Sequence, residues 1–174
     1  MNMKKTAWKW ASIILLVMTM TTTVGAASGS DEYKPVEKTF NQEAVFINSI
    51  QVENGNVYLN VDRIQWYEGE EANEVFRQRE QDPEMTEAPD GYYIVNDEHE
   101  QVVLPVKEDA EVQLQLYDHT GRMEDAEIIW NQQVSLKKFL SVYDKKDIVD
   151  MAWFPYHITI EDGKIVRIIQ QYTP

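Results

Sequence analysis

The amino-acid sequence predicts a mainly β fold, a small and partly open barrel of five or six strands with two short helices. Runs of alternating apolar residues are separated by turn dipeptides, which is typical of antiparallel strands. Two short segments place their apolar residues at helical spacing instead. A strand-like run, residues 155–174, also continues almost to the end of the chain. A strand in that position favours a sheet that is closed by its last strand.

The first residues of the chain have the features of an export signal. Three lysines open the chain, residues 11–20 form a short apolar core, and Val24-Gly25-Ala26 supplies the small-x-small pattern of a signal-peptidase site. We therefore expect residues 1–26 to be a signal peptide that is removed after Ala26. An uncleaved membrane anchor is the alternative, although the threonine-rich half of this stretch poorly matches the roughly 20 apolar residues that a membrane span requires.

Charge and the lack of cysteine narrow the classes of function. Without cysteine the chain can carry neither disulfides nor a lipid on a cysteine. Its formal net charge is -14, and loss of three of its 16 basic residues with the signal peptide, against 30 acidic ones, brings it to -17. So acidic a surface repels nucleic acid and anionic lipid. We expect a secreted or otherwise extracytoplasmic protein with no nucleic-acid partner and no stable membrane association after cleavage.

Residues 27–44 are polar and of mixed charge, which predicts a flexible linker before a single β-rich domain at residues 45–174. The domain begins with a hairpin whose turn is Asn54-Gly55, because both residues tolerate positive φ angles. A change in the apolar phase after this hairpin predicts a β-bulge near Asp62-Arg63. The expected facing pairs are Val52–Val57, Ile50–Leu59 and Asn48–Val61.

Two helices and further strands follow along the domain. Apolar residues at helical spacing predict a short helix from Glu70 to Arg79. Alternating patterns over residues 91–96, 101–106 and 110–117 predict three strands. Ser135 is expected to cap the second short helix, which carries its apolar residues on one side.

The final hairpin turns at Asp162-Gly163, and its register has two solutions. A two-residue turn pairs Ile160 with Ile165 but leaves Arg167 opposite an isoleucine. A three-residue turn with a glycine bulge is favoured, because it places no charge against the core. The favoured pairs are Ile158–Val166 and Tyr156–Ile168.

The sequence contains no familiar pattern of an active site or a metal centre. No serine lies in a G-x-S-x-G motif, and the three histidines, His99, His119 and His157, are scattered. The DEHE run at residues 97–100 lacks the second histidine of H-E-x-x-H and is interpreted as a turn between strands. Nine acidic residues in 68–90 indicate a solvated charged face, with weak calcium binding as the alternative. We predict no catalytic residue, no metal centre and no cofactor.

Aromatic residues are the strongest candidates for a binding surface. They occur as two adjacent pairs and in a short cluster before the final hairpin. Adjacent residues in a strand point to opposite faces, so one member of each pair can lie in the core and the other can be exposed to a sugar or protein partner. The alternative is that all of them fill a small β core. The candidates are Trp66, Tyr67, Tyr92, Tyr93, Trp153 and Tyr156.

Four motifs occur together in the domain: QWYEGEEA at residues 65–72, GYYIVN at 91–96, VVLPV at 102–106, and a DG hairpin ending in Gln-Tyr at 155–172. Together they resemble a group of uncharacterised exported proteins of Gram-positive bacteria. The resemblance implies export and a Gram-positive source, and it implies no catalytic or binding residue. The order of the expected elements also resembles that of small exported OB-fold-like barrels.

These observations predict a non-enzymatic binding or interaction module at the bacterial cell surface or in the medium, with a protein or carbohydrate partner. The prediction depends on the absence of a recognisable nucleophile, acid–base pair or ligand set in the sequence. A hydrolase that uses unidentified carboxylates and a structural protein of the envelope are the two alternatives. Thirty acidic residues make a catalytic carboxylate pair easy to imagine but impossible to locate from sequence.

Overall fold

The computed structural model describes residues 33–81 and 84–174, so the predicted signal peptide, residues 1–26, lies outside the described residues. Within these two ranges no helix is both long and apolar enough to span a bilayer. The described chain forms two helices, α1 (Gly69–Glu80) and α2 (Leu136–Tyr143). It also forms six strands, which are β1 (Gln42–Glu53), β2 (Asn56–Glu68), β3 (Tyr92–Leu114), β4 (Gln132–Val134), β5 (Pro155–Glu161) and β6 (Lys164–Gln170).

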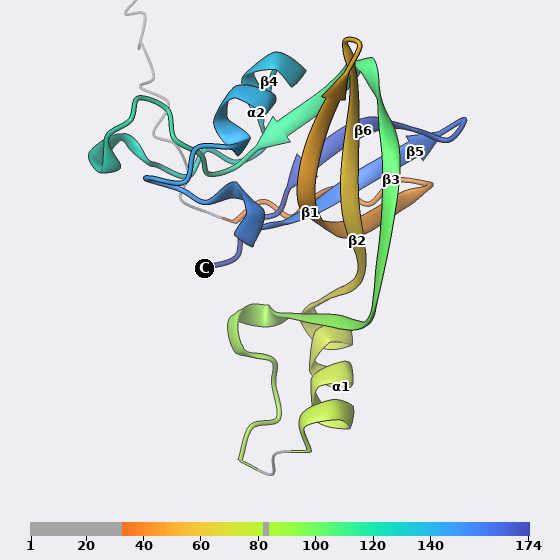
Figure 1. The fold of residues 1–174 in the computed structure, drawn as a ribbon. Helices are drawn as coiled ribbons and strands as arrows, with labels where there is room; N and C mark the ends of the chain where they lie inside the picture. The colour runs from red at the N-terminus through yellow and green to blue at the C-terminus, as the bar shows by residue number, and fades with distance from the viewer. Residues whose placement is uncertain (1–32, 82–83) are drawn as a thin grey trace, which may run out of the picture. The chain divides into compact units, whose positions relative to one another are not determined.

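The strands form one mixed sheet in the order β2-β1-β5-β6-β3-β4, and an additional pairing joins β2 to β3. Hydrogen bonds therefore run in a ring through β1, β2, β3, β6 and β5, and β4 extends the sheet beyond β3 (Figure 1). Only the β3–β6 pairing is parallel among these described strands. The mainly β prediction is confirmed, and a partly open OB-like barrel fits this order.

One main hydrophobic core fills the ring, and every strand of the ring contributes to it. Its fully buried side chains include Ile47, Leu59, Leu114 and Ile168. Helix α2 adds Phe139, which is also fully buried. As predicted, the Ser135 side chain caps this helix, accepting a hydrogen bond of 3.1 Å from the backbone N–H of Lys138.

The first hairpin follows the predicted register near its turn and then departs from it. Val52–Val57 and Ile50–Leu59 face one another as expected, but Val61 faces Ile47 because Asn48 is an extra residue in β1. The bulge predicted in β2 at Asp62-Arg63 is therefore in the opposite strand. The alternation of apolar and polar residues along β2 changes for another reason, namely that both faces of the second half of the strand are covered. Val61 and Ile64 are both buried and lie on opposite faces of the strand.

The three strands predicted between residues 91 and 117 are a single long strand, β3, with two interruptions in its pairing. Its pairing with β2 jumps from Arg63–Glu100 to Gln65–Val95, so that residues 96–99, most of the DEHE run, form an irregular segment. The predicted turn at DEHE is thus a local distortion in a strand that continues. Pairing with β2 resumes on both sides of this distortion, which a single-strand pattern cannot reveal.

Helix α1 confirms the prediction for residues 70–79, within one residue at each end. Its buried residues Ala72 and Phe76 pack with Ala88, Tyr67 and Tyr93 in a second, smaller core. The predicted linker differs from the structure where it is described: β1 begins at Gln42, and the side chain of Val36 is buried. The second half of that segment therefore belongs to the folded domain, because an apolar side chain in it finds a place in the core.

The register favoured for the final hairpin is wrong. The turn at Asp162-Gly163 has two residues, and Ile160 faces Ile165. A bulge then shifts the pairing, so that Arg167 faces Thr159 rather than an isoleucine. The observed inner pairs are Ile158–Ile168 and Tyr156–Gln170. The bulge removes the charge from the core without lengthening the turn.

The last strand closes the ring, as predicted. β6 lies between β5, to which it is antiparallel, and β3, to which it is parallel. Ile165, Ile168 and Ile169 are buried almost completely. The chain keeps regular structure up to Gln170 because a strand with neighbours on both sides has both of its backbone edges paired.

Candidate ligand-binding site

A pocket of about 610 Å³ lies where several distant parts of the chain meet. Its walls come from the segment before β1, the end of β2, the start of β3, the loop before β4, and the residues after β6. We call it the aromatic pocket. Its aromatic lining residues are Tyr33, Trp66, Tyr92, Trp130 and Tyr172.

One wall of the aromatic pocket is a stacked pair of rings from neighbouring strands. Trp66 faces Ile94 across the β2–β3 ladder, which makes Tyr92 its diagonal neighbour on the same face. The two rings are nearly parallel, with centroids 4.7 Å apart and an interplanar angle of 12°. The sheet register therefore determines this wall directly.

The facing walls come from residues at the two ends of the domain. Tyr33 packs edge-to-face on Trp130, with centroids 5.3 Å apart, and Trp130 packs in the same manner on Tyr172, at 5.9 Å. The Tyr33 hydroxyl donates a hydrogen bond of 2.7 Å to a carboxylate oxygen of Glu68. Gln171 Nε2 in turn donates to the Tyr33 hydroxyl at 3.2 Å. These contacts tie residues before β1 to residues after β6.

Two buried glutamines hold the walls in position from behind. Gln170 Oε1 accepts hydrogen bonds from the backbone N–H groups of Gln115 and Leu116, at 2.8 and 2.9 Å. Gln115 Oε1 accepts a bond of 2.6 Å from the backbone N–H of Tyr172, and its Nε2 donates to Asn131 Oδ1 at 3.0 Å. Because Asn131 follows Trp130, the side chain of Gln115 connects two walls of the pocket.

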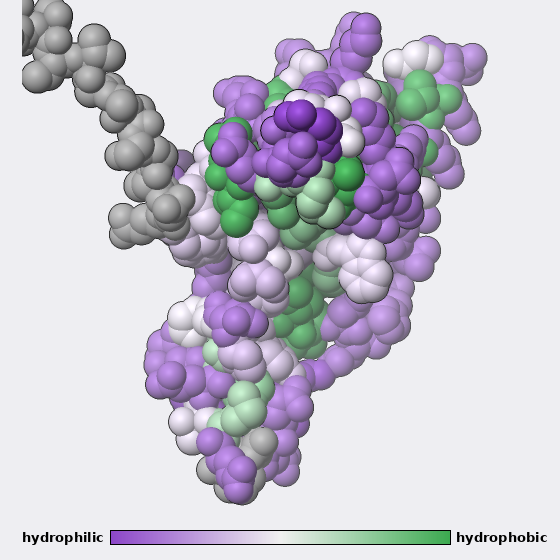
Figure 2. All heavy atoms as spheres, turned by 90° about the vertical axis from the view of Figure 1, so that its left-hand side faces the viewer, coloured by the Kyte–Doolittle hydropathy of each residue, from purple (hydrophilic) through white to green (hydrophobic). Residues whose placement is uncertain are grey.

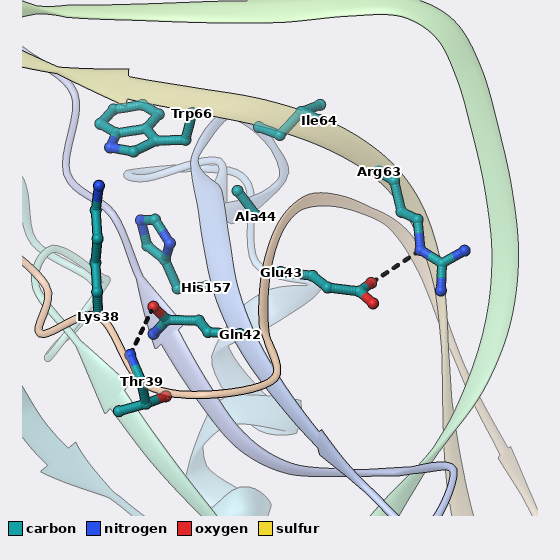
Figure 3. A pocket seen from close by; sticks show the side chains of 9 residues that line it. All are labelled: Lys38, Thr39, Gln42, Glu43, Ala44, Arg63, Ile64, Trp66 and His157. Atoms are coloured by element: carbon teal, nitrogen blue, oxygen red, sulfur yellow. Dashed lines mark hydrogen bonds and ion pairs between the residues drawn. The ribbon is translucent and has the colours of Figure 1, made fainter. Parts of the chain in front are cut away.

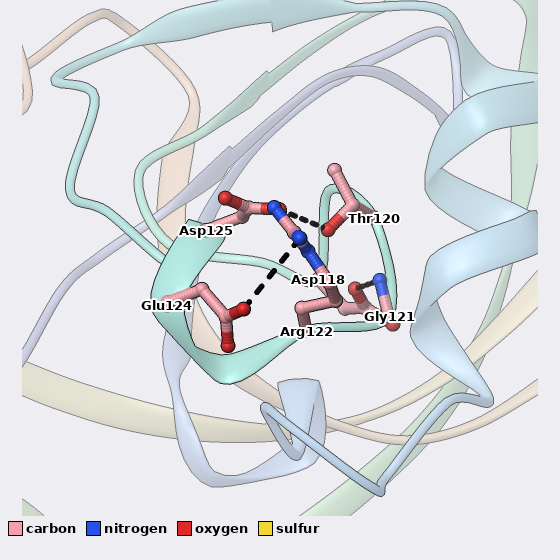
Figure 4. A network of polar contacts seen from close by, with 6 residues as sticks. All are labelled: Asp118, Thr120, Gly121, Arg122, Glu124 and Asp125. Atoms are coloured by element: carbon pink, nitrogen blue, oxygen red, sulfur yellow. Dashed lines mark hydrogen bonds and ion pairs between the residues drawn. The ribbon is translucent and has the colours of Figure 1, made fainter.

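The loop that carries Trp130 has its own polar network (Figure 4). The Thr120 hydroxyl donates a bond of 2.6 Å to Asp125, and the Arg122 guanidinium donates to the same carboxylate at 2.8 and 2.9 Å. Asp118, which is buried, accepts a hydrogen bond from the backbone N–H of Gly121. These local bonds give shape to a segment without regular strand or helix.

The predicted candidate aromatics separate into four different environments. Only Trp66 and Tyr92 line the aromatic pocket. Their sequence neighbours Tyr67 and Tyr93 point to the other face, where they pack against α1, and Tyr93 also donates a hydrogen bond to Glu80. The predicted division of each pair between two faces is thus confirmed.

The remaining two candidates lie elsewhere. Tyr156 is fully buried in the main core, where its hydroxyl donates a bond of 2.8 Å to the carbonyl of Met151. Trp153 is 78% exposed, and its indole N–H donates to Asp150 at 3.2 Å. Neither residue lines the aromatic pocket, because the chain turns into the core between them.

Sequence reasoning missed three members of the pocket: Tyr33, Trp130 and Tyr172. Tyr33 lies in the segment predicted to be a linker, and Trp130 lies in a loop after a charged run. Tyr172 belongs to the Gln-Tyr pair at the end of the final hairpin motif, which is the only sequence signal that pointed to it. Single aromatics in irregular segments carry no periodicity, so a pattern search passes over them.

The charged side chains that line the aromatic pocket are all acidic. Two carboxylates, Glu68 and Asp90, line it, and no described lining residue is Lys, Arg or His. Burial, reinforced by a hydrogen bond to Glu68, raises the pKa of Tyr33 to about 12. Burial and the charge of Asp90 also raise the pKa of Tyr92. Both phenols therefore stay protonated at physiological pH, and the only formal charges at the pocket are negative.

A second pocket, of about 620 Å³, is also lined by Trp66 and lies between β1, β2 and β5 (Figure 3). Its character is different, since Lys38, Arg63 and His157 line it. Arg63 donates a hydrogen bond of 2.8 Å to Glu43, which neutralises that carboxylate. Burial lowers the pKa of His157, so its imidazole is neutral at pH 7. We find no arrangement here of a nucleophile with a base among the described lining residues.

The face drawn in Figure 2 is predominantly hydrophilic, with hydrophobic atoms gathered in a few patches. Within the described ranges, no cluster of three or more His, Asp or Glu side chains is placed to hold a metal ion. Comparisons with family models, with curated proteins and with solved structures found no match to this chain. The resemblance to exported Gram-positive proteins therefore stays a prediction, and the proposals below depend on the geometry of the site.

Proposed function

We propose that this protein is an exported, extracytoplasmic binding module whose ligand occupies the aromatic pocket. One observation carries the proposal: five aromatic side chains from five separate segments converge on one cavity, and of these only Tyr172 also packs against the main core. Tyr33 and Tyr172 are far apart in the sequence and meet only at this pocket. Large aromatic side chains that line a cavity are typical of sites that bind a partner.

The dimensions of the pocket support a small ligand or a single group of a larger one. Ligand pockets commonly have volumes of roughly 300–1,000 Å³ and combine an apolar lining with few polar groups. The aromatic pocket, at about 610 Å³, falls within this range. A sugar ring, an amine or one peptide side chain fits such a volume, whereas an extended protein surface does not enter it. The proposed ligand is therefore a small molecule or an exposed group on a protein or polysaccharide.

Export is supported by the signal-peptide features and the acidic composition. A net charge of -14 opposes binding to nucleic acid and to anionic polymers. The two carboxylates at the aromatic pocket add to this exclusion locally. Neutral and cationic compounds are thus the ligand classes that the charge distribution favours.

The test is a ligand screen followed by variants of the pocket. Thermal shift measurements on a panel of neutral sugars, amines and short peptides would identify binders, and calorimetry would give their affinities. We expect Tyr92→Ala and Trp130→Ala to weaken binding by about tenfold or more, because central aromatic contacts commonly contribute over 1 kcal/mol. Trp153→Ala is the matched control, since it removes an exposed indole that lies outside the pocket.

Two outcomes would count against the proposal. A ligand that binds equally well to both pocket variants and to the wild type occupies another site. A complete lack of binders in the panel contradicts a binding function for this pocket. Circular dichroism of each variant shows whether the fold is retained, so that lost affinity is not confused with unfolding.

A hydrolase remains the second candidate function, and the aromatic pocket supplies the observation in its favour. Glu68 and Asp90 are two carboxylates at one cavity, which is the minimum set for glycoside hydrolysis. Prolonged incubation of each binder with the protein, analysed by mass spectrometry, distinguishes the two functions. Hydrolysis that Glu68→Gln abolishes would establish an enzyme, and unchanged ligand would support a binding module.

A further inference from the structure

We propose that the ligand of the aromatic pocket carries an alkylated ammonium group, which the aromatic rings and the two carboxylates hold together. This inference rests on the proposed binding function and names the chemical class of the ligand. Such cations are attracted to the negative face of aromatic rings at centroid distances within about 6 Å. They also avoid the heavy desolvation cost of a compact primary ammonium, because their charge is spread over methyl groups.

The arrangement of the rings is suited to surround a cation. Tyr33 and Trp130 are inclined at 86°, and Trp130 and Tyr172 at 76°, as adjacent walls of a box are. Trp66 and Tyr92 are stacked on one another, so this pair offers an outer face rather than a gap for insertion. A rounded trimethylammonium group can contact several such walls at once, whereas a flat ring ligand would use only one.

The charge distribution distinguishes this cavity from the second pocket. Glu68 and Asp90 line it without a basic residue among the described lining side chains, whereas Lys38 and Arg63 line the second pocket. A cation is therefore favoured in the aromatic pocket over the second pocket. The negative charge of the whole chain adds long-range attraction for a cation in the same direction.

The hydrogen-bonding groups of the pocket are partly committed to the protein and partly free. The Tyr33 hydroxyl is engaged with Glu68 and Gln171, and the Gln171 amide N–H also donates to the Tyr172 carbonyl at 3.0 Å. A sugar ring needs several free donors and acceptors around its edge, and among the buried atoms of the described lining residues Trp66 Nε1 and Gln171 Oε1 have no partner. A quaternary ammonium needs no hydrogen bond at all.

The direct test compares choline with 3,3-dimethylbutan-1-ol (dimethylbutanol below), a neutral compound of the same shape in which carbon replaces the nitrogen of choline. Titration of the protein with each, followed by tryptophan fluorescence and calorimetry, gives two dissociation constants. We expect choline to bind at least about tenfold more tightly, since its extra attraction to rings and carboxylates is electrostatic. Equal affinity for the two compounds would overturn the inference while leaving the pocket a binding site.

Two conservative substitutions test the contribution of each carboxylate charge to choline binding. Glu68→Gln keeps an oxygen that accepts from Tyr33 and removes the charge. Asp90→Asn keeps a residue type that tolerates the positive φ of 60° found there. We expect each to weaken choline binding by about threefold to tenfold and to leave dimethylbutanol binding unchanged. Glu108→Gln is the matched control, because it removes an exposed charge outside the pocket and should have no effect.

Failure of this inference can be told apart from failure of the proposed function. If choline does not bind, but a neutral sugar or peptide binds and loses affinity in Tyr92→Ala, the cation inference is wrong and the binding function stands. If no compound binds in a manner that depends on the pocket, both are wrong. Choline binding that survives in Glu68→Gln and Asp90→Asn at full strength would also refute the inference.

Discussion

The buried amide of Gln170 offers a sharp test of how the end of the chain is held. Its side chain is fully buried and makes three hydrogen bonds to the backbone of Gln115 and Leu116, which follow β3. Gln170→Leu keeps a similar volume and removes all three bonds. The backbone N–H groups of Gln115 and Leu116 and the carbonyl of Leu116 then lose their partner.

The size of the effect follows from these three groups. A buried polar group without a hydrogen bond costs about 1–3 kcal/mol. Leu116 is only half-buried, so water can partly satisfy its two groups, and the lower end of the range applies. We therefore expect Gln170→Leu to lower the free energy of unfolding by about 3 kcal/mol. This is a large fraction of the roughly 5–15 kcal/mol typical of a domain, but the variant should still fold.

Urea unfolding followed by far-UV circular dichroism measures this difference directly. An unchanged m-value would show that the native state remains equally compact. Gln51→Leu is the matched control, because Gln51 is exposed on β1 and its replacement should change stability by less than about 0.5 kcal/mol. A loss below about 1 kcal/mol in Gln170→Leu would refute the reasoning and show that the three bonds do not hold the tail.

Three further predictions test the closing strand, a buried histidine and the acidic surface. Removal of Ile165–Pro174 should abolish cooperative melting, and Ile168→Asp should do the same because it buries an unpaired charge. Removal of Thr173–Pro174 should have little effect. A cooperative melt in the longer truncation would contradict the role of β6. Burial lowers the pKa of His157 below 6.5 in the folded state. The stability that the neutral imidazole contributes should therefore be full above pH 6.5 and fall as the pH drops toward the folded-state pKa. Chemical unfolding at several pH values should show this dependence, and His157→Gln should flatten it. Millimolar calcium and magnesium should raise the melting temperature slightly and equally by screening repulsion, and a shift above about 10 °C with calcium alone would reveal a specific site.

Local features of the fold were readable from sequence because they depend on a few neighbouring residues. Both hairpins turn where the sequence predicted, at Asn54-Gly55 and Asp162-Gly163, because asparagine, aspartate and glycine tolerate the positive φ found there. The second turn has two residues rather than the three that were favoured. Ser135 caps α2 through a bond that spans three residues. The apolar content of β6 also indicated a strand with neighbours on both sides, since a strand at an edge would leave one row of backbone groups unpaired.

The positions of the bulges could not be derived in this way. Asn48 is an extra residue in β1, and the final hairpin shifts its pairing after the turn, so the registers predicted from each turn hold only near it. Each of these strands has a second neighbour in the ring, and both pairings must be satisfied together. The long strand β3 illustrates the same point, because its pairing with β2 continues on both sides of a segment that alone is typical of a turn.

The candidate site depends both on local sequence patterns and on the tertiary structure. The alternation of Trp66-Tyr67 and Tyr92-Tyr93 was sufficient to place their members on opposite faces, but the position of α1 decided which face became a small core and which became a pocket wall. The sequence by itself determined the positions of the two hairpin turns, the cap of α2 and the apolar faces, since these depend on backbone preferences and spacing within a few residues. Only the tertiary structure brought Tyr33 and Tyr172 to one cavity, because ring closure by β6 depends on pairing between segments that are distant in the chain.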